Sequence, residues 1–374
     1  MQILADQNMP LVESFFSDIG EVQRFDGRNL QPEALREADV LLTRSVTKVN
    51  EALLAQAKQL KFVGTATIGV DHIDTQLLKN SGIAFSSAPG CNAIAVAEYV
   101  ISGLLAYAQE TCTVLQGKTI AIVGVGNIGK CLAEKVKGLG LKVLLCDPVR
   151  NQAGDLESHV ELDEALTLAD IVSFHVPLVK NGEHKTVHLL DKARIASLKP
   201  GMVVVNASRG DVIDNQALLS AVEKGQQLEL ILDVWENEPT ILQPLLDHTR
   251  FASVHIAGHT LEGKARGTQM LYEAVCREFA LQPHKTINDF LAQPSITECL
   301  LQSTASEQDI IRLVHLVYDI RRDDGMMRAQ LSSQGFDALR KAYPVRREFS
   351  TIAVNGDSPI SEKLFQLGFS ERKR

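Results

Sequence analysis

The chain has 374 residues, and 38 Lys and Arg against 46 Asp and Glu give it a formal net charge of −8. This length is enough for two or three domains, and 45% hydrophobic with 22% charged residues is the composition of an ordinary globular protein. The acidic balance, without a long block of like charges, gives no reason to expect binding to nucleic acid or to an anionic membrane. The six cysteines are scattered without a C-x-x-C pair or metal-ligand spacing, so we expect reduced thiols in a cytoplasmic protein.

Short apolar runs alternate with amphipathic stretches through the first three quarters of the chain, which is typical of parallel strands joined by helices. A first small α/β domain is expected, followed by a long apolar helix from residue 93 to about residue 109. That helix contains Glu98 and is shorter than the roughly 20 apolar residues of a membrane span, so no membrane-spanning segment is predicted. The strands predicted for the first domain are residues 3–5, 40–43, 62–65 and 83–86.

A second domain begins near the apolar strand at residues 119–125, and the same alternation predicts a doubly wound parallel sheet for it. From about residue 285 the pattern changes to helical periodicity at residues 307–319 and 336–343 and a short strand at 351–354, which predicts a third, α+β domain. The remaining elements predicted for the second domain are strands at 143–146, 171–174, 202–206 and 230–233 and a helix at 215–224. The predicted domains are residues 1–95 with 260–285, 96–259, and 286–374.

A glycine-rich segment, Gly124-Val-Gly126-Asn-Ile-Gly129, lies between the strand at 119–125 and an amphipathic helix. The first glycine permits a tight turn, the second lets a pyrophosphate approach the backbone, and the third lets helix and strand pack closely. With Asn127 and Ile128 at the start of the helix, these glycines predict a dinucleotide-binding loop. The alternative interpretation is that these glycines form only a turn.

Asp147 ends the next predicted strand, about 20 residues after the first glycine, which is the offset of an acid that binds the adenosine ribose. A carboxylate there accepts hydrogen bonds from the ribose hydroxyls and repels the extra phosphate of NADP. NAD is therefore the predicted cofactor. The nearby Arg150 leaves open the alternatives of stacking on adenine or tolerating a 2′-phosphate.

Three polar residues follow the ends of later predicted strands: Arg209, Glu238 and His255. In a doubly wound sheet these ends border the ligand crevice. Oxidation of a 2-hydroxy acid needs a forked cation for the carboxylate and a base for the hydroxyl proton, and Arg209 and His255 meet these needs. Glu238 is suited to orient His255 and to stabilise its imidazolium form. For each residue alone, an ordinary structural role is the simpler interpretation.

The motifs at residues 124–129, 174–178, 206–210, 232–235 and 255–256 resemble the D-2-hydroxyacid dehydrogenase family over most of the first 280 residues. The resemblance implies that Arg209 binds the substrate carboxylate, that Glu238 and His255 form the acid/base pair, and that Asp233 binds the nicotinamide carboxamide. The family's usual proline before the catalytic histidine is Val254 here, which we expect to change loop stiffness without removing the chemistry. Further cofactor contacts implied by the resemblance are Val176, Ala207, Ser208, Arg209 and Gly258.

Further segments, at residues 43–50, 64–67, 88–93, 255–267 and 313–322, resemble one branch of this family over nearly the whole chain. That branch carries out NAD-dependent oxidation of 4-phospho-D-erythronate to the 2-oxo acid in the route to pyridoxal phosphate. The resemblance implies two doubly wound Rossmann-like domains plus a C-terminal α+β dimerisation domain, in a cytoplasmic homodimer.

A phosphorylated sugar acid needs cationic or hydroxyl donors for its phosphate in addition to Arg209. Ser45 and Thr67 are implied as substrate contacts by the resemblance, and Arg44 and Lys48 are chemically suited, with ordinary solvated loop residues as the alternative interpretation. His259 stands where tyrosine occurs in relatives and is a further substrate candidate.

Other functions remain open from the sequence. Another member of the same family, such as a phosphoglycerate or glycerate dehydrogenase, would share Arg209, Glu238 and His255, and a non-catalytic NAD-sensing corepressor would share the fold. The pairs His255 with His259 and His184 with His188 have i,i+4 spacing, but neither has the helical context or the glutamate of a zinc motif. No metal is predicted.

Overall fold

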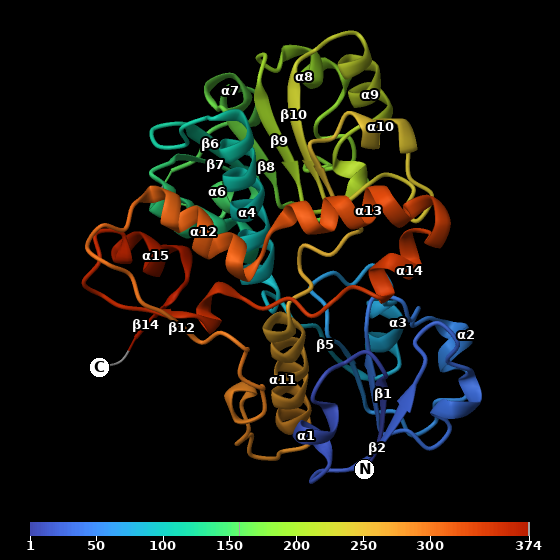
Figure 1. Ribbon diagram of the computed structural model, residues 1–374. Helices are drawn as coiled ribbons and strands as arrows, with labels where there is room; N and C mark the ends of the chain where they lie inside the picture. Colours follow the sequence, from blue (N-terminus) through green and yellow to red (C-terminus); the bar gives the residue numbers. More distant parts are fainter. Residues whose placement is uncertain (157, 373–374) are drawn as a thin grey trace. The chain divides into compact units, whose positions relative to one another are not determined.

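The computed structural model describes residues 1–156 and 158–372, which divide into two compact units. Unit 1 consists of Met1–Asn92 and His259–Gln293, and unit 2 consists of Ala93–Gly258 and the chain from Pro294 onwards. Each unit contains a parallel sheet with helices, so the predicted α/β class is confirmed (Figure 1). The predicted division into three domains stays a prediction. The C-terminal residues group with unit 2 in this division.

Unit 1 is built on a five-stranded sheet in the order β2-β1-β3-β4-β5, with every neighbouring pair parallel. Its central strands bury side chains on both faces, as expected when helices cover both sides. One face packs against α1 and α11, where Phe15, Phe16 and Tyr272 meet. The strands are β1 (Gln2–Asp6), β2 (Glu21–Phe25), β3 (Val40–Thr43), β4 (Phe62–Thr65) and β5 (Ala84–Ser86). The helices are α1 (Val12–Phe16), η1 (Pro32–Leu35), α2 (Glu51–Leu54), α3 (Thr75–Asn80), α11 (Leu261–Glu278) and η4 (Ile287–Asp289).

Unit 2 is built on a six-stranded parallel sheet in the order β11-β10-β9-β8-β6-β7. The strand order reverses direction between β6 and β8, so the crevice expected in a doubly wound sheet lies at the carboxyl ends of those two strands. The strands are β6 (Thr119–Val123), β7 (Lys142–Cys146), β8 (Ile171–Phe174), β9 (Met202–Asn206), β10 (Leu228–Leu232) and β11 (Phe251–Ala252). The helices are α4 (Ala93–Thr111), α5 (Asn127–Val136), η2 (Lys137–Leu139), α6 (Pro148–Gln152), α7 (Leu162–Leu168), α8 (Lys192–Ser197), η3 (Gly210–Val212), α9 (Asn215–Glu223) and α10 (Gln243–Asp247).

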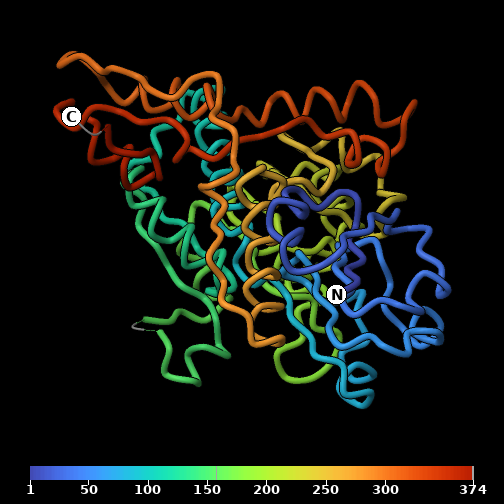
Figure 2. Tube along the Cα trace, turned by 90° about the horizontal axis from the view of Figure 1, so that it is seen from below, coloured from blue at the N-terminus to red at the C-terminus, as the bar shows by residue number. Residues whose placement is uncertain are grey.

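The C-terminal part of unit 2 packs on α4 and on the glycine-loop helix α5. The run from α12 to α13 lies along the top of Figure 2, and α15 lies beside α5. Buried ionisable side chains join the parts, since Glu98 on α4 lies 3.5 Å from the ammonium of Lys135 on α5 and accepts a hydrogen bond from the backbone of Phe349. The elements are β12 (Glu298–Cys299), α12 (Glu307–Val317), α13 (Ile320–Gln334), α14 (Phe336–Lys341), η5 (Phe349–Thr351), β13 (Ala353–Val354), α15 (Ser361–Leu367) and β14 (Ser370–Glu371).

Most predicted strands are present within a residue or two, but other parts of the prediction differ from the structure. The helix predicted for 307–319 ends at Val317, and an unpredicted helix, α13, follows it. Edge strands β2 and β11 were also not predicted, because one is half polar and the other has only two residues. Among the described residues, no helix is long and apolar enough to cross a membrane.

Candidate active site

The predicted cofactor and catalytic residues of unit 2 follow the carboxyl ends of β6 to β11, on one edge of the sheet. The glycine loop follows β6, Val176 follows β8, and Arg209 follows β9. Asp233 follows β10 and His255 follows β11. Because parallel strands all point the same way, this topology gathers residues that are far apart in sequence.

The glycine loop fits a bound pyrophosphate at each of its three glycines. Gly124 has a φ of +90°, and a Cβ there would lie 2.7 Å from the backbone of His175. A Cβ at Gly129 would collide with the carbonyl oxygen of Gly124, so only glycine allows α5 to begin so close to the loop. Gly126, by contrast, faces open space within 4 Å. An open approach to the N-terminus of α5, which begins at Asn127, is the geometry that a dinucleotide phosphate requires.

Asp147 lies at the end of β7 and connects that strand to the glycine loop. Its carboxylate accepts hydrogen bonds from the backbone N–H of Val125 at 2.8 Å and of Arg150 at 3.1 Å. A carboxylate has about four acceptor positions, so capacity remains for ribose hydroxyls. The Arg150 guanidinium donates to the carbonyl of Val125 and pairs with Asp155 at 3.2 Å. The carboxylate is therefore the group that fits the predicted ribose contact.

Val176 and His175 lie directly beside Gly124 after β8. Val176 is half-buried, and its side chain is the neighbour that a Cβ on Gly124 would meet at 2.8 Å. His175 is buried, shares a 2.8 Å hydrogen bond with Ser173, and burial lowers its pKa to about 3. This histidine is therefore neutral at working pH and is not suited to act as the base.

Arg209 is positioned by the turn after β9. The Asn206 side chain accepts hydrogen bonds from Ser208 and donates to the carbonyl of Arg209 at 2.9 Å, which fixes the turn containing Ala207. A Cβ on Gly210 would collide with the backbone of Trp235, so only glycine lets this turn lie against the segment that leads to Glu238. The Arg209 guanidinium also donates to the carbonyl of Ser208 at 2.8 Å.

Glu238 and His255 form the pair predicted from the sequence. His255 Nδ1 lies 2.7 Å from Glu238 Oε2, while Glu238 Oε1 accepts the backbone N–H of Trp235 at 2.9 Å. Burial by itself raises the pKa of Glu238, but the hydrogen bond and charge of His255, the Trp235 N–H and the charge of Arg340 together lower it below its ordinary value. Glu238 is therefore ionised at neutral pH. Its carboxylate assigns the proton to Nδ1 and leaves Nε2 available to accept a proton.

The backbone that carries His255 is held by Asp233. His255 has a φ of +57°, in the left-handed region that non-glycine residues rarely adopt. Its N–H donates to the Asp233 carbonyl oxygen at 2.8 Å. The next two N–H groups, of Ile256 and Ala257, donate to the Asp233 carboxylate at 2.7 and 3.0 Å. These three hydrogen bonds together fix the turn that presents the imidazole.

Asp233 is itself held in place by a neighbouring hydroxyl, because Ser253 donates to its carboxylate at 2.6 Å. A carboxylate has about four acceptor positions, so Asp233 keeps capacity for the nicotinamide carboxamide predicted from the sequence. Gly258, another predicted cofactor contact, ends this turn at the boundary of unit 2.

The five substrate candidates belong to unit 1. Arg44, Ser45 and Lys48 follow the carboxyl end of β3, and Thr67 follows that of β4, where it donates to the Gly69 carbonyl at 2.9 Å and lies 2.8 Å from Thr65 Oγ1. Arg44 donates to the carbonyl of Asn8 at 3.1 Å, and Ser45 is exposed. His259 is half-buried before α11. Their role in substrate binding stays a prediction.

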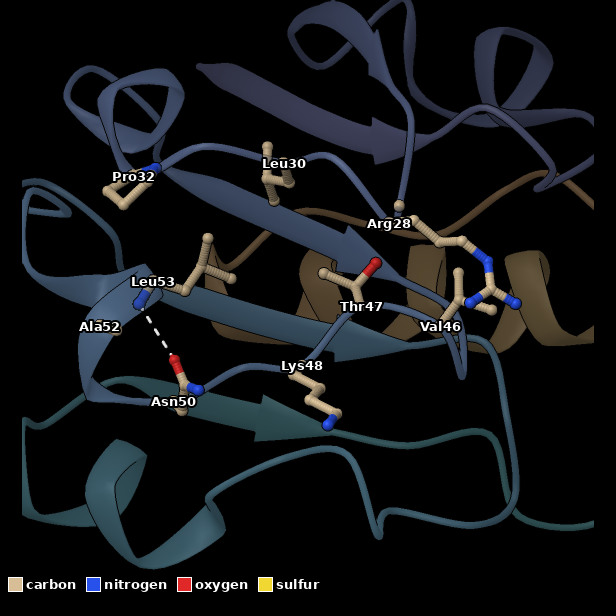
Figure 3. A pocket seen from close by; sticks show the side chains of 10 residues that line it. Arg28, Leu30, Pro32, Val46, Thr47, Lys48, Asn50, Ala52 and Leu53 are labelled. Carbon is tan, nitrogen blue, oxygen red and sulfur yellow. Dashed lines mark hydrogen bonds between the residues drawn. The ribbon is translucent and has the colours of Figure 1, made fainter. Parts of the chain in front are cut away.

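Lys48 also lines a cavity of about 390 Å³ in unit 1, shown in Figure 3. Arg28 and Thr47 also line it, and Asn50 accepts a hydrogen bond from Leu53 to begin α2. The cavity has no signal in the sequence, because its lining comes from two separate segments, residues 27–32 and 46–53.

One cluster in unit 2 was not singled out by its spacing in the sequence. His188, Asp214 and Glu236 hold potential ligand atoms within 4.8 Å of one another. The cluster is held by internal hydrogen bonds, since His188 Nε2 lies 2.6 Å from Glu236 Oε1 and the other Glu236 oxygen accepts the N–H of Asn215. These contacts join His188 and Glu236 to each other and to the first residue of α9.

Comparison with known proteins identifies the class to which this site belongs. Residues 95–259 match the family model described as D-isomer specific 2-hydroxyacid dehydrogenase, NAD binding domain, and residues 290–368 match a domain of unknown function (DUF3410). These matches cover the glycine loop, the Glu238–His255 pair and most of the C-terminal region.

Relatives that match over nearly the full length of the chain identify the family within this class of dehydrogenases. Proteins named erythronate-4-phosphate dehydrogenase from Pseudoalteromonas translucida, Tolumonas auensis and Proteus mirabilis are 63%, 50% and 48% identical, and each match covers 99% of both chains. The chain therefore belongs to the erythronate-4-phosphate dehydrogenase family of the D-isomer specific 2-hydroxyacid dehydrogenases.

Solved structures agree on the fold. The TT0316 protein from Thermus thermophilus is 26% identical with a TM-score of 0.62, and the match covers 76% of this chain and 98% of that one. An NAD⁺-bound 3-phosphoglycerate dehydrogenase from Entamoeba histolytica is 22% identical with a TM-score of 0.63, and the match covers 75% of this chain and 95% of that one. These structures are nearly fully matched, whereas about a quarter of this chain lies outside each match.

Proposed function

We propose that this protein is an NAD-dependent dehydrogenase that oxidises erythronate 4-phosphate at its 2-hydroxyl group, a step in the route to pyridoxal phosphate. The observation that carries the chemistry is the 2.7 Å contact between His255 and Glu238 on the sheet edge that also carries the glycine loop. The full-length relatives supply the substrate.

Each residue of the site has a defined task in this reaction. Arg209 holds the substrate carboxylate with its forked guanidinium. His255 accepts the 2-hydroxyl proton at Nε2, and Glu238, through Nδ1, stabilises the imidazolium that forms. NAD, when bound, supplies the acceptor for the hydride that leaves C2. Asp147 and the glycine loop bind its ribose and pyrophosphate, with Asn127, Ile128, Val176, Ala207, Ser208 and Gly258 as further contacts.

The substrate phosphate requires donors of its own, because Arg209 is assigned to the carboxylate. We assign this task to Ser45, Thr67, Arg44, Lys48 and His259, because their cations, hydroxyls and imidazole match the chemistry of a phosphate. Substitution of each residue by alanine, with KM measured for substrates with and without the phosphate, tests the assignment.

The protein is further proposed to work in the cytoplasm as a homodimer. All six cysteines lie in the described part of the chain and are thiols there, which suits a reducing compartment. Leu316 and Val345 in the C-terminal region are large apolar side chains with 48% and 76% of their surface exposed, which suits a subunit contact. Sedimentation of the purified protein tests the dimer.

Initial rates of NADH formation test the function. Erythronate 4-phosphate, 3-phosphoglycerate and glycerate are compared by kcat/KM in one buffer, and NADP is substituted for NAD. We expect a clear preference for erythronate 4-phosphate with NAD. A preference for another acid refutes the substrate, and tight NAD binding without turnover of any acid refutes the enzyme in favour of an NAD-sensing protein.

A further inference from the structure

An arginine side chain of the C-terminal region contacts the backbone of His255, the proposed base. Arg340, in the last turn of α14, donates from Nε to the carbonyl oxygen of His255 at 3.2 Å. His255 then has its N–H bound by Asp233, its imidazole by Glu238 and its carbonyl by Arg340. Of these three partners, only Arg340 lies outside the part of the chain that matches the dehydrogenase model.

The position of Arg340 is set by a chain of contacts within unit 2. α13 is held to the edge strand β11 and to helix α10, because Asp324 accepts the N–H of Ala252 at 3.0 Å and Arg328 donates to the carbonyl of Leu246 at 3.0 Å. α14 follows α13 directly (Figure 1), and the buried side chains of Phe336 and Leu339 hold it in place. Arg340 is therefore a side chain on an anchored helix.

A second arginine from the same region binds the same turn. Arg346 is buried, lies 3.6 Å from the centre of the Tyr318 ring, and donates to the carbonyl of Ala257 at 3.1 Å. The C-terminal region thus holds carbonyl groups on two residues of the segment 255–257. The N–H groups of the same segment are held by Asp233.

The left-handed conformation of His255 explains why such a support is useful. A non-glycine residue at a φ of +57° is held there only when its surroundings fix the backbone. A small rotation of this residue would move the imidazole away from Glu238 and from the substrate hydroxyl, and misplacement by about 1 Å is able to cost about 100-fold in rate.

We propose that Arg340 is a positioning residue for the reaction: it holds the His255 backbone so that the Glu238–His255 pair faces the substrate, and it makes the C-terminal region part of the active site. The proposal rests on the proposed function. The positive charge of Arg340 also acts with His255 to favour the ionised form of Glu238.

Substitution of Arg340 tests the proposal, with Lys341→Ala on the same helix as the matched control because Lys341 is exposed. We expect Arg340→Ala to lower kcat by about tenfold or more, with the NADH dissociation constant, the oligomeric state and the unfolding midpoint near those of Lys341→Ala. Arg340→Lys retains a donor and the charge and should recover part of kcat. Arg340→Gln retains a donor without the charge, and it should recover less at low pH, because Glu238 then protonates at a higher pH.

Three outcomes would overturn the proposal. An unchanged kcat in Arg340→Ala means that the contact does not position His255. A rise in substrate KM alone means that Arg340 binds substrate instead. A fall in kcat that Arg340→Lys does not relieve, and that parallels a loss of thermal stability, means a purely structural role. If the wild-type protein does not oxidise erythronate 4-phosphate, the proposed function fails, and the same variants are compared with whichever 2-hydroxy acid it does oxidise.

Discussion

Replacement of Glu238 by glutamine is the sharpest test of the assigned acid/base pair. The backbone N–H of Trp235 is a fixed donor to Glu238 Oε1, so the amide oxygen of glutamine takes that position. The amide nitrogen then faces His255 Nδ1 in place of Oε2 and donates to it. The imidazole proton is consequently moved to Nε2, which is the atom that has to accept the substrate proton.

The expected loss follows from two contributions. A hydrogen bond to a charged group contributes about 1.5–3 kcal/mol, which corresponds to about 10- to 150-fold in rate. The reversed tautomer adds to this loss, so we expect kcat for Glu238→Gln to fall at least about 100-fold, while the NAD dissociation constant changes less than about threefold.

The assay is steady-state NADH formation together with NAD binding by fluorescence. Glu236→Gln is the matched control, because Glu236 forms a similar 2.6 Å contact with His188 away from the proposed chemistry. A kcat within about threefold of wild type for Glu238→Gln, or an equal loss in Glu236→Gln, would refute the reasoning.

The same variant has a predictable pH dependence of stability. The pKa of Glu238 is lowered in the folded protein, because the His255, Trp235 and Arg340 contributions exceed the effect of burial. Its ionised form therefore stabilises the fold at pH values above its ordinary pKa, and this contribution is lost as pH falls through the lowered folded pKa. We expect the difference in unfolding free energy between wild type and Glu238→Gln to be largest at neutral pH and to shrink in acid.

Three further predictions concern other parts of the molecule. The Cβ of Gly126→Ala meets no protein atom within 4 Å among the described residues, so this variant should keep its stability and bind NAD about tenfold or more weakly. Gly129→Ala should lower both the stability and the NAD affinity, and calorimetry with thermal unfolding distinguishes the two variants. Unchanged NAD binding in Gly126→Ala would contradict the loop assignment. Arg209→Ala should raise the substrate KM by about 100-fold with NAD binding near normal, and a parallel loss of NAD affinity in equilibrium titrations would count against its role. Burial raises the pKa of Glu98 to about 8 even with the Lys135 ammonium 3.5 Å away, and Lys135→Met removes that favourable charge and raises the pKa further. The destabilisation by Lys135→Met should therefore be smaller at about pH 6, where Glu98 is protonated in both proteins, and should grow toward about 3 kcal/mol as pH rises above about 8. A pH-independent loss in denaturant unfolding would contradict this expectation.

The sequence predicted the elements whose patterns are local. The glycine loop, Asp147 and the buried strands of both sheets have short-range signals, because turn chemistry and continuous apolar runs are properties of neighbouring residues. The helix α13 was missed because its buried residues Ile320, Asp323, Met327 and Leu331 include a carboxylate and are surrounded by charges.

Contacts between distant segments were harder to predict. Glu238 and His255 were paired from chemical need, and the structure places their atoms at 2.7 Å. The use of the Asp233 carboxylate to bind the N–H groups of Ile256 and Ala257 had no sequence signal, since it depends on the left-handed turn at His255. The same holds for Arg340, whose partner lies 85 residues earlier in the chain.

The hydrogen bonds that hold the turn at residues 255–257 affect which side chains the preceding position, 254, is able to accept. The resemblance stated above leads one to expect a proline before His255, whereas Val254 stands there and is fully buried. With Asp233 binding the amides and Arg340 and Arg346 binding the carbonyls, the geometry of the histidine no longer depends on a rigid residue before it. If Arg340 positions His255 as proposed, position 254 accepts any side chain that fills the core, whereas Arg340 and Arg346 of the C-terminal region are the residues whose exchange disturbs the turn.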